Sequence, residues 1–151
     1  MIIREASVED YVSIAEIIRE CLGYSCEDQV VRRKLSQIDK EREIVFVAEL
    51  EDKVVGYIHG DKFELLYMDS LINVLCLAVD ENYRHNGIGS ALLNQIEVWA
   101  KDRGAVGIRL NSASAYCKRF VWRNKGRAPF NIKAYFNISL WRWRIFIKNR
   151  S

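Results

Sequence analysis

The stretch from residue 71 to residue 110 constrains the fold of this chain most strongly. Leu71 to Val79 is a nearly continuous apolar run, which is typical of a strand covered on both faces. Gly87 to Arg103 predicts a helix, because its apolar residues recur at helical spacing, and Gly104 is expected to end it. Val106 to Leu110 has the composition of another strand. Strand, helix and strand in this order predict a βαβ unit with two parallel strands.

The residues before this unit predict a strand, two helices and a two-stranded hairpin. Ser7 can cap the first helix, and Gly23 is expected to end it. Glu51 to Lys53 has the polar composition of a turn between two β-branched runs, which predicts a hairpin. Gly56 interrupts the second run, where a bulge or a close backbone approach is expected. The predicted ranges are 1–4 for the first strand, 7–22 and 27–38 for the helices, and 44–50 and 54–60 for the hairpin.

The end of the sequence predicts a helix and a closing pair of strands. The helix is expected from Ser112 to Asn124, and Pro129 should interrupt the chain after it. The two strands are expected from Ile132 to Ile138 and from Leu140 to Ile147. Apolar and basic residues largely alternate in the second strand, as they do in a strand with one buried face.

Composition indicates one globular domain over residues 1–151. Half of the residues are hydrophobic and only one is proline, which excludes a disordered chain. The charged start does not resemble a signal peptide, and the apolar run that begins at Leu71 is too short to span a bilayer. We therefore expect a cytoplasmic protein with no membrane partner, with reduced thiols and without a metal site. The four cysteines are Cys21, Cys26, Cys76 and Cys117.

A loop between the central strand and the following helix carries the functional signal. Leu77 to Val79 ends the strand, and Arg84 precedes two glycines, Gly87 and Gly89, that open the helix. Unpaired amides and the dipole make a helix start positive, and glycines let a phosphate approach it. The Walker loop does not fit, since no Lys-Ser or Lys-Thr follows the glycines. The dinucleotide fingerprint does not fit either, since Leu92 stands at its third glycine.

The pattern Arg84-x-x-Gly87-x-Gly89 after Leu77-Ala78-Val79 resembles the signature of the GNAT family of N-acetyltransferases. The resemblance covers about residues 1–112. It implies an α+β fold with a mixed sheet, splayed at its centre and flanked by helices. The implied order is strand, two helices, three strands, helix, strand, helix and two strands.

The resemblance implies acetyl-coenzyme A as co-substrate. The pantetheine arm would pair with the strand end like an added strand, and the diphosphate would rest on the loop amides. An amine of a small molecule or peptide would attack the thioester directly, without an acyl-enzyme. The cofactor-binding residues so implied are Leu77, Ala78, Val79, Arg84, His85, Asn86, Gly87, Ile88, Gly89 and Ser90.

The sequence does not decide which residues act as the catalytic base and acid. Glu64 and Asp69 precede the central strand, where substrate loops lie in the family, so either is a candidate base. His59 and Asp80 are further candidates for this role. Family members place a tyrosine acid in the last helix. Trp122 stands at that position here, and Tyr116 is the nearest tyrosine.

The sequence leaves three functions open. The first is an N-acetyltransferase that acts on a primary amine. The second is a catalytically impaired protein that still binds acetyl-coenzyme A. The third, which we favour least, is a nucleic-acid-binding protein. Homodimers are common in the family, so a homodimer also stays open.

Charge divides the chain into two unlike parts. Residues 1–102 carry 11 basic and 20 acidic residues, whereas residues 103–151 carry 12 basic residues and no acid. Two explanations stay open for the atypical segment 113–151. It is either a basic, tryptophan-rich surface for an anionic partner or the product of a reading-frame shift near Ser112 to Ala115.

Overall fold

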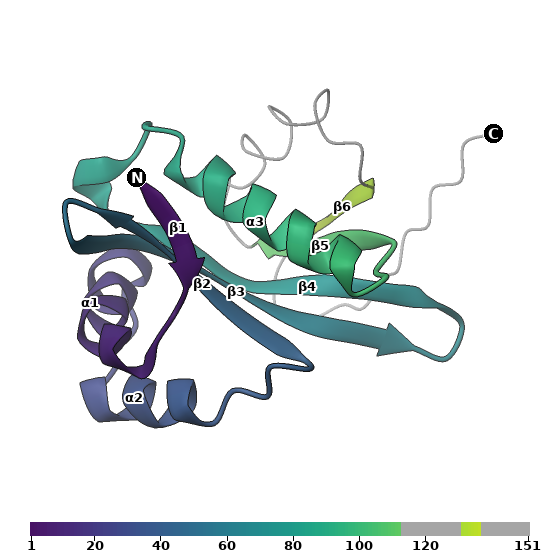
Figure 1. Ribbon diagram of the computed structural model, residues 1–151, viewed down its shortest axis with the longest axis horizontal. Helices are drawn as coiled ribbons and strands as arrows, with labels where there is room; N and C mark the ends of the chain where they lie inside the picture. The colour runs from purple at the N-terminus through teal and green to yellow at the C-terminus, as the bar shows by residue number, and fades with distance from the viewer. Residues whose placement is uncertain (113–130, 137–151) are drawn as a thin grey trace.

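A computed structural model describes residues 1–112 and 131–136, with side-chain surroundings up to residue 110. Six strands form one mixed sheet in the order β1-β2-β3-β4-β5-β6. Neighbouring strands are antiparallel from β1 to β4 and parallel from β4 to β6. Helices α1 and α2 lie on one side of the sheet and α3 lies on the other (Figure 1). The strands are β1 (Ile2–Glu5), β2 (Glu43–Leu50), β3 (Lys53–Leu65), β4 (Met68–Val79), β5 (Gly107–Ser112) and β6 (Asn131–Phe136); the helices are α1 (Tyr11–Leu22), α2 (Asp28–Ser36) and α3 (Ile88–Asp102).

The predicted elements up to residue 110 are present, with shifted ends. The helix predicted over 87–103 is α3, and the parallel βαβ unit of β4, α3 and β5 is confirmed. The predicted close approach at Gly56 is also confirmed, because a Cβ atom there would lie 3.0 Å from the Ala78 carbonyl oxygen. The antiparallel hairpin is confirmed, but β3 runs to Leu65 and so extends beyond the predicted end at Gly60.

One expectation at the end of the described chain was wrong. Ser112 belongs to strand β5, where it pairs with Phe136, so no helix begins at this residue. The strand predicted from Ile132 is confirmed as β6, which lies parallel to β5. The predicted strand from Leu140 to Ile147 and the predicted helix after Ser112 lie outside the described residues.

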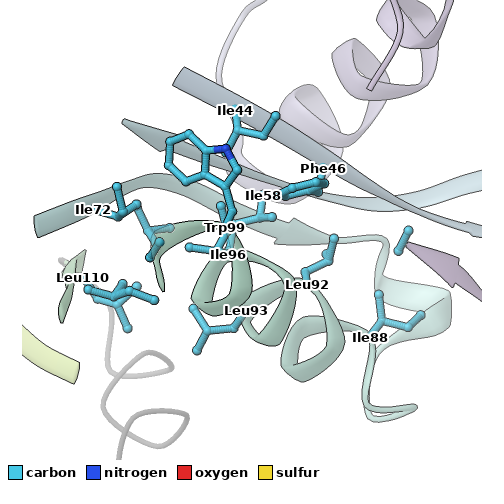
Figure 2. Packing of buried hydrophobic residues seen from close by; sticks show 14 of the residues in the cluster. Ile44, Phe46, Ile58, Ile72, Ile88, Leu92, Leu93, Ile96, Trp99 and Leu110 are labelled. Carbon is cyan, nitrogen blue, oxygen red and sulfur yellow. The ribbon is translucent and has the colours of Figure 1, made fainter. Parts of the chain in front are cut away.

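The larger core lies between the sheet and α3. Figure 2 shows Leu92, Ile96 and Trp99 of this helix packed toward Ile58 and Ile72 of the sheet. Leu92 and Ile96 are completely buried, as the predicted stripe requires. A second core on the opposite face joins α1 and α2 to β2, β3 and β4. Both faces of β4 are therefore covered over part of its length, which explains its continuous apolar sequence.

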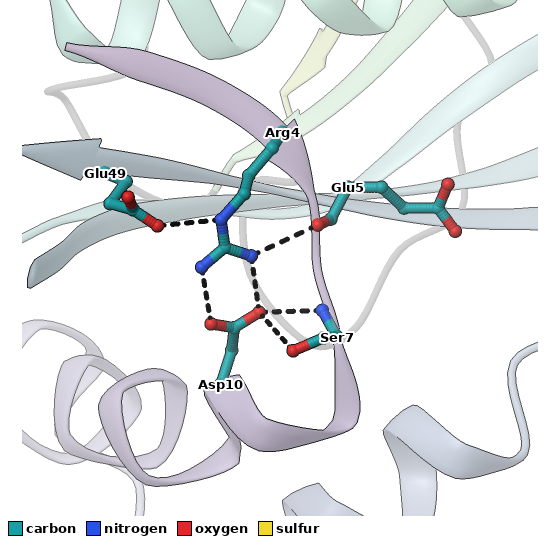
Figure 3. Close-up of polar contacts among 5 residues, drawn as sticks. All are labelled: Arg4, Glu5, Ser7, Asp10 and Glu49. Atoms are coloured by element: carbon teal, nitrogen blue, oxygen red, sulfur yellow. Dashed lines mark hydrogen bonds and ion pairs between the residues drawn. The ribbon is translucent and has the colours of Figure 1, made fainter. Parts of the chain in front are cut away.

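An ion cluster fixes the passage from β1 into α1 (Figure 3). The Arg4 guanidinium donates two hydrogen bonds of 2.8 Å to the Asp10 carboxylate and one of 2.8 Å to Glu49. The Ser7 amide donates to the same Asp10 carboxylate at 2.7 Å. Ser7 is the N-cap of the turn before the helix, as the sequence predicted, and Asp10 accepts the reciprocal hydrogen bond of a capping box. Burial alone would raise the pKa of Asp10, but the hydrogen bonds from Arg4 and Ser7 outweigh it and lower that pKa.

Replacing Leu92 with alanine should destabilise the fold strongly. Deletion of a fully buried leucine side chain costs about 2–5 kcal/mol, because it removes apolar contacts and leaves a cavity. Val98→Ala on the same helix is the matched control, since Val98 is 50% exposed, and should change the free energy of unfolding by about 0.5 kcal/mol or less. Urea denaturation measures both, and equal effects would contradict the packing described for α3.

Asp10→Asn should destabilise the fold in a pH-dependent way. A carboxyl group whose pKa is lower in the folded state stabilises the fold above its unfolded pKa of about 3.9. This contribution is lost as the pH falls through the lower, folded value. The difference in unfolding free energy between the wild type and Asp10→Asn should therefore be full at about pH 6 and shrink below about pH 4. Asp52→Asn in the β2–β3 turn is the control, and a difference that stays constant with pH would refute the role given to Asp10.

Candidate functional site

Strands β4 and β5 separate in the middle of the sheet. They pair only at Ile72 with Ile108, Asn73 with Arg109 and Val74 with Leu110. In the described part of the chain, residues 76–79 of β4 pair with β3 but with nothing on the β5 side, and Leu75 pairs with neither strand. The N–H and C=O groups on that edge can therefore accept another extended chain. This separation is the splay that the sequence predicted.

A β-bulge lies at the point where the strands separate. His59 pairs with Cys76 and Gly60 pairs with Val74, so Leu75 is an extra residue in β4. A bulge bends its strand and ends regular pairing on the bulged side. Leu75 is 51% exposed although it lies in the central strand. The bulge therefore accounts for the opening between β4 and β5.

The turn after β4 is built around Asp80. Its carboxylate accepts hydrogen bonds from the Asn82 backbone at 3.0 Å and from the Asn82 side chain at 3.1 Å. Lys53 lies 3.5 Å from the other carboxylate oxygen. The pKa of Asp80 is lowered, mainly because the Asn82 N–H donates to the charged form, and Lys53 adds to this effect. Asp80 therefore acts as the cap of the short helix Glu81–Tyr83, and its contacts disfavour the role of base that the sequence had left open.

Arg84 is tied to the end of β4. Its Nε donates to the Val79 carbonyl at 3.1 Å, and its Nη1 lies 2.9 Å from a Glu81 carboxylate oxygen. The guanidinium thus joins the loop to the strand end and stays partly exposed. Glu81 is at the surface, so its ion pair with Arg84 is weak and an incoming anion can compete for the guanidinium.

The loop before α3 presents a row of free backbone amides. Gly87 caps the helix with φ of 77°, and His85 has φ of 68°, a left-handed geometry that suits glycine best. Within residues 1–112 and 131–136, the N–H groups of residues 85–90 donate no hydrogen bond. Free amides at a positive helix start are a site for phosphate groups. The predicted cofactor residues therefore fall into two adjoining parts, the free strand edge 77–79 and the loop 84–90.

The predicted catalytic residues do not gather at this opening. Glu64 lies in β3 and Asp69 in β4 at the far end of the hairpin, so both belong to strands and not to the expected loop. Lys62, at 2.8 Å, lowers the pKa of Glu64, and Ser70 donates to it at 3.2 Å. These contacts make Glu64 a weak base. Tyr116 and Trp122 lie outside the described residues.

A buried hydroxyl–thiol pair that the sequence did not indicate lies on the α1 side of the sheet. The Tyr57 hydroxyl and the Cys76 thiol lie 3.0 Å apart across β3 and β4. Burial raises the pKa of both groups, so both keep their protons at neutral pH. Cys76 is partly buried against the second core. Its contact with Tyr57 depends on the register of β3 against β4, which pairs Tyr57 with Ala78 and His59 with Cys76 and which no local sequence signal marks.

The part of the chain that the structure describes shows neither a metal cluster nor a membrane-spanning helix. No group of three or more His, Cys, Asp or Glu side chains is arranged there to hold a metal ion. None of the described helices is both long and apolar enough to cross a bilayer.

Comparisons with known proteins agree with this geometry. The model of the acetyltransferase (GNAT) family matches residues 11–120. An amino-acid acetyltransferase of Pseudomonas putida is 32% identical over 139 residues, which cover 87% of this chain and 28% of that protein. Its counterpart in Pseudomonas paraeruginosa is 35% identical over 107 residues, 68% of this chain and 22% of that protein. The chain thus spans only about 28% of the length of the curated relative from Pseudomonas putida.

Solved structures share the fold. A transcriptional regulator from Bacillus halodurans superposes with a TM-score of 0.73 at 18% identity, covering 97% of this chain and 99% of that one. An aminoglycoside acetyltransferase from an uncultured soil metagenomic sample, in complex with sisomicin, gives a TM-score of 0.69 at 22% identity, covering 92% and 95%. At these identities the likeness establishes the α+β architecture alone.

Replacing Asp80 with alanine should destabilise the turn that carries the loop. Loss of a capping carboxylate costs roughly 0.5–2 kcal/mol, because the backbone N–H that it satisfied loses its partner. Asp80→Asn is the matched control, since asparagine caps nearly as well and should restore most of the loss. Urea denaturation of the two variants distinguishes a cap from a merely charged position, and equal losses would argue against the capping role.

Proposed function

The chain belongs to the acetyltransferase (GNAT) family, and we propose that it transfers an acetyl group from acetyl-coenzyme A to a primary amine of a small molecule or peptide. The observation that carries this proposal is the free edge of β4 that leads directly into the free amides of residues 85–90. A strand edge suits the amide-containing pantetheine arm. A helix start with unpaired N–H groups suits the diphosphate.

The described residues fit such a co-substrate in both parts. Residues 77–79 would pair with pantetheine along the edge that β5 leaves uncovered, where the Val79 carbonyl already accepts a hydrogen bond from Arg84. The loop from Arg84 to Ser90 would receive the diphosphate, and Arg84 would add a positive charge at the loop entrance. Curated relatives carry the name amino-acid acetyltransferase, which supports a small amine acceptor.

The proposed reaction is a direct transfer. The unprotonated amine attacks the thioester carbonyl carbon, a C–N bond forms, and the C–S bond breaks. Coenzyme A leaves as a thiolate that takes up one proton, while the amine gives its proton to a base or to water. The contribution of the fold is to position the thioester, because the fold would hold it where β4 and β5 separate.

A second candidate function rests on one observation. Trp122 stands where the family's general-acid tyrosine is expected, and an indole has no ionisable hydroxyl. A protein that binds acetyl-coenzyme A but transfers slowly or not at all would fit this replacement. Thiol release measured across a panel of amines separates the two functions, since only the enzyme releases coenzyme A faster than buffer does.

Binding of acetyl-coenzyme A should stabilise the chain and depend on the loop. A ligand at 100 times its Kd adds about 2.7 kcal/mol to stability, so the wild-type melting temperature should rise. The variant Arg84→Ala with Gly89→Asp should abolish the rise, because it removes a cation and places a carboxylate among the amides.

Arg33→Ala on the exposed side of α2 removes the same charge elsewhere and should keep the full rise. Isothermal calorimetry gives the affinities directly, and urea denaturation verifies that the double variant is folded. An unchanged affinity in a folded double variant would refute the loop as the diphosphate site.

A further inference from the structure

A row of polar side chains crosses the sheet in register. Glu43 of β2 pairs with Asp61 of β3, Asp61 pairs with Asn73 of β4, and Asn73 pairs with Arg109 of β5. Paired residues of neighbouring strands project from the same face of a sheet. All four side chains are half-buried, so none belongs to the fully buried core.

This polar row lies on the face opposite α3. The residues next to it in sequence, Ile44, Ile72 and Ile108, belong to the core beneath α3. Successive residues of a strand point to opposite faces. The polar row therefore shares its face with α1, α2 and the Tyr57–Cys76 pair.

The polar row carries both signs of charge, two carboxylates and one guanidinium. The Arg109 guanidinium lies 4.6 Å from the centre of the Phe63 ring, so it reaches across β4 to β3. Phe63 follows Asp61 by two residues and lies on the same face. In the part of the chain that the structure describes, the Asp61 carboxylate makes no hydrogen bond or ion pair. Glu43 differs, because it lies 3.2 Å from His59.

The polar row meets β4 where the cofactor opening closes. Asn73 directly precedes Val74, the last residue of β4 that pairs with β5. A cofactor whose diphosphate rests on residues 85–90 and whose arm follows β4 backward from Val79 would bring its thioester to this point. An acceptor amine would have to reach the same point, so the polar row would lie beside the reacting atoms.

We propose that Asp61 and Arg109 form the acceptor subsite and that the acceptor is a small zwitterion with an ammonium and a carboxylate group. A guanidinium binds a carboxylate through two parallel hydrogen bonds, and a free carboxylate accepts from an ammonium. The backbones of β3 and β5 lie two strand spacings apart, about 10 Å, and the register places Asp61 and Arg109 on one face with Asn73 between them. Asn73 between them can donate and accept. This proposal rests on the proposed acetyltransferase function.

The test uses the full chain and three matched sets of acceptors. These are the common L-amino acids, their α-carboxamides and the corresponding decarboxylated amines. Thiol release from acetyl-coenzyme A gives kcat and KM for each acceptor, and calorimetry in the presence of coenzyme A gives acceptor affinity. We expect at least one amino acid to bind and react, with kcat/KM at least tenfold above its amide and its decarboxylated amine.

Two variants test separately the roles proposed for Arg109 and Asp61. Arg109→Gln should raise KM for the amino acid about 10- to 100-fold, as expected for loss of charge-assisted hydrogen bonds. It should leave kcat/KM for the decarboxylated amine unchanged, a readout that a merely structural role would not give. Asp61→Asn should weaken all three acceptor classes. Arg33→Gln and Asp52→Asn make the same chemical changes at exposed positions and should leave the kinetics unchanged.

Three outcomes would overturn the proposal. Decarboxylated amines could react as well as amino acids, Arg109→Gln could impair all classes equally, or no amino acid could bind to a protein that binds acetyl-coenzyme A. The third outcome leaves the acetyltransferase assignment standing and removes only the zwitterion subsite. Failure to bind acetyl-coenzyme A, measured first, overturns both proposals.

Discussion

The structure depends on the extra residue in the central strand. Leu75 breaks the register between β3 and β4 at the point where pairing between β4 and β5 ends. Had β4 continued without a bulge, β5 could have paired along its length, and residues 75–79 would have had no free edge. The βαβ unit then places the start of α3 just beyond that edge. The opening between β4 and β5 therefore follows from the bulge at Leu75. The position of the loop of free amides follows from the βαβ connection.

Much of the fold was readable from the sequence because its signals are local. The helical stripe of α3 and the apolar run of β4 follow directly from residue spacing. The pattern from Arg84 to Gly89 marked the loop, and the family comparison confirms the kinship that this pattern indicated. Such features need no knowledge of which strands pair.

Features that depend on register were not readable. The length of β3, the bulge at Leu75 and the pairing of Asp61 with Asn73 and Arg109 arise between segments that are distant in sequence. The sequence alone also could not decide between the two explanations of the basic segment 113–151. The relative from Pseudomonas putida aligns with 87% of the chain, a share larger than residues 1–112 can supply. The relative from Pseudomonas paraeruginosa aligns with only 68% of the chain, so both explanations of the segment stay predictions that resequencing of the gene would separate.

The separation of the two cores by the sheet has a consequence for how such a protein changes. The core beneath α3 supports the loop of free amides, whereas the core beneath α1 and α2 lies on the face of Tyr57 and Asp61. Substitutions that share no contacts have nearly additive effects on stability. Under the proposed function, mutations on the α1–α2 face could therefore change acceptor preference while the α3 face keeps the loop that would bind the nucleotide, so one scaffold could serve many amines during evolution.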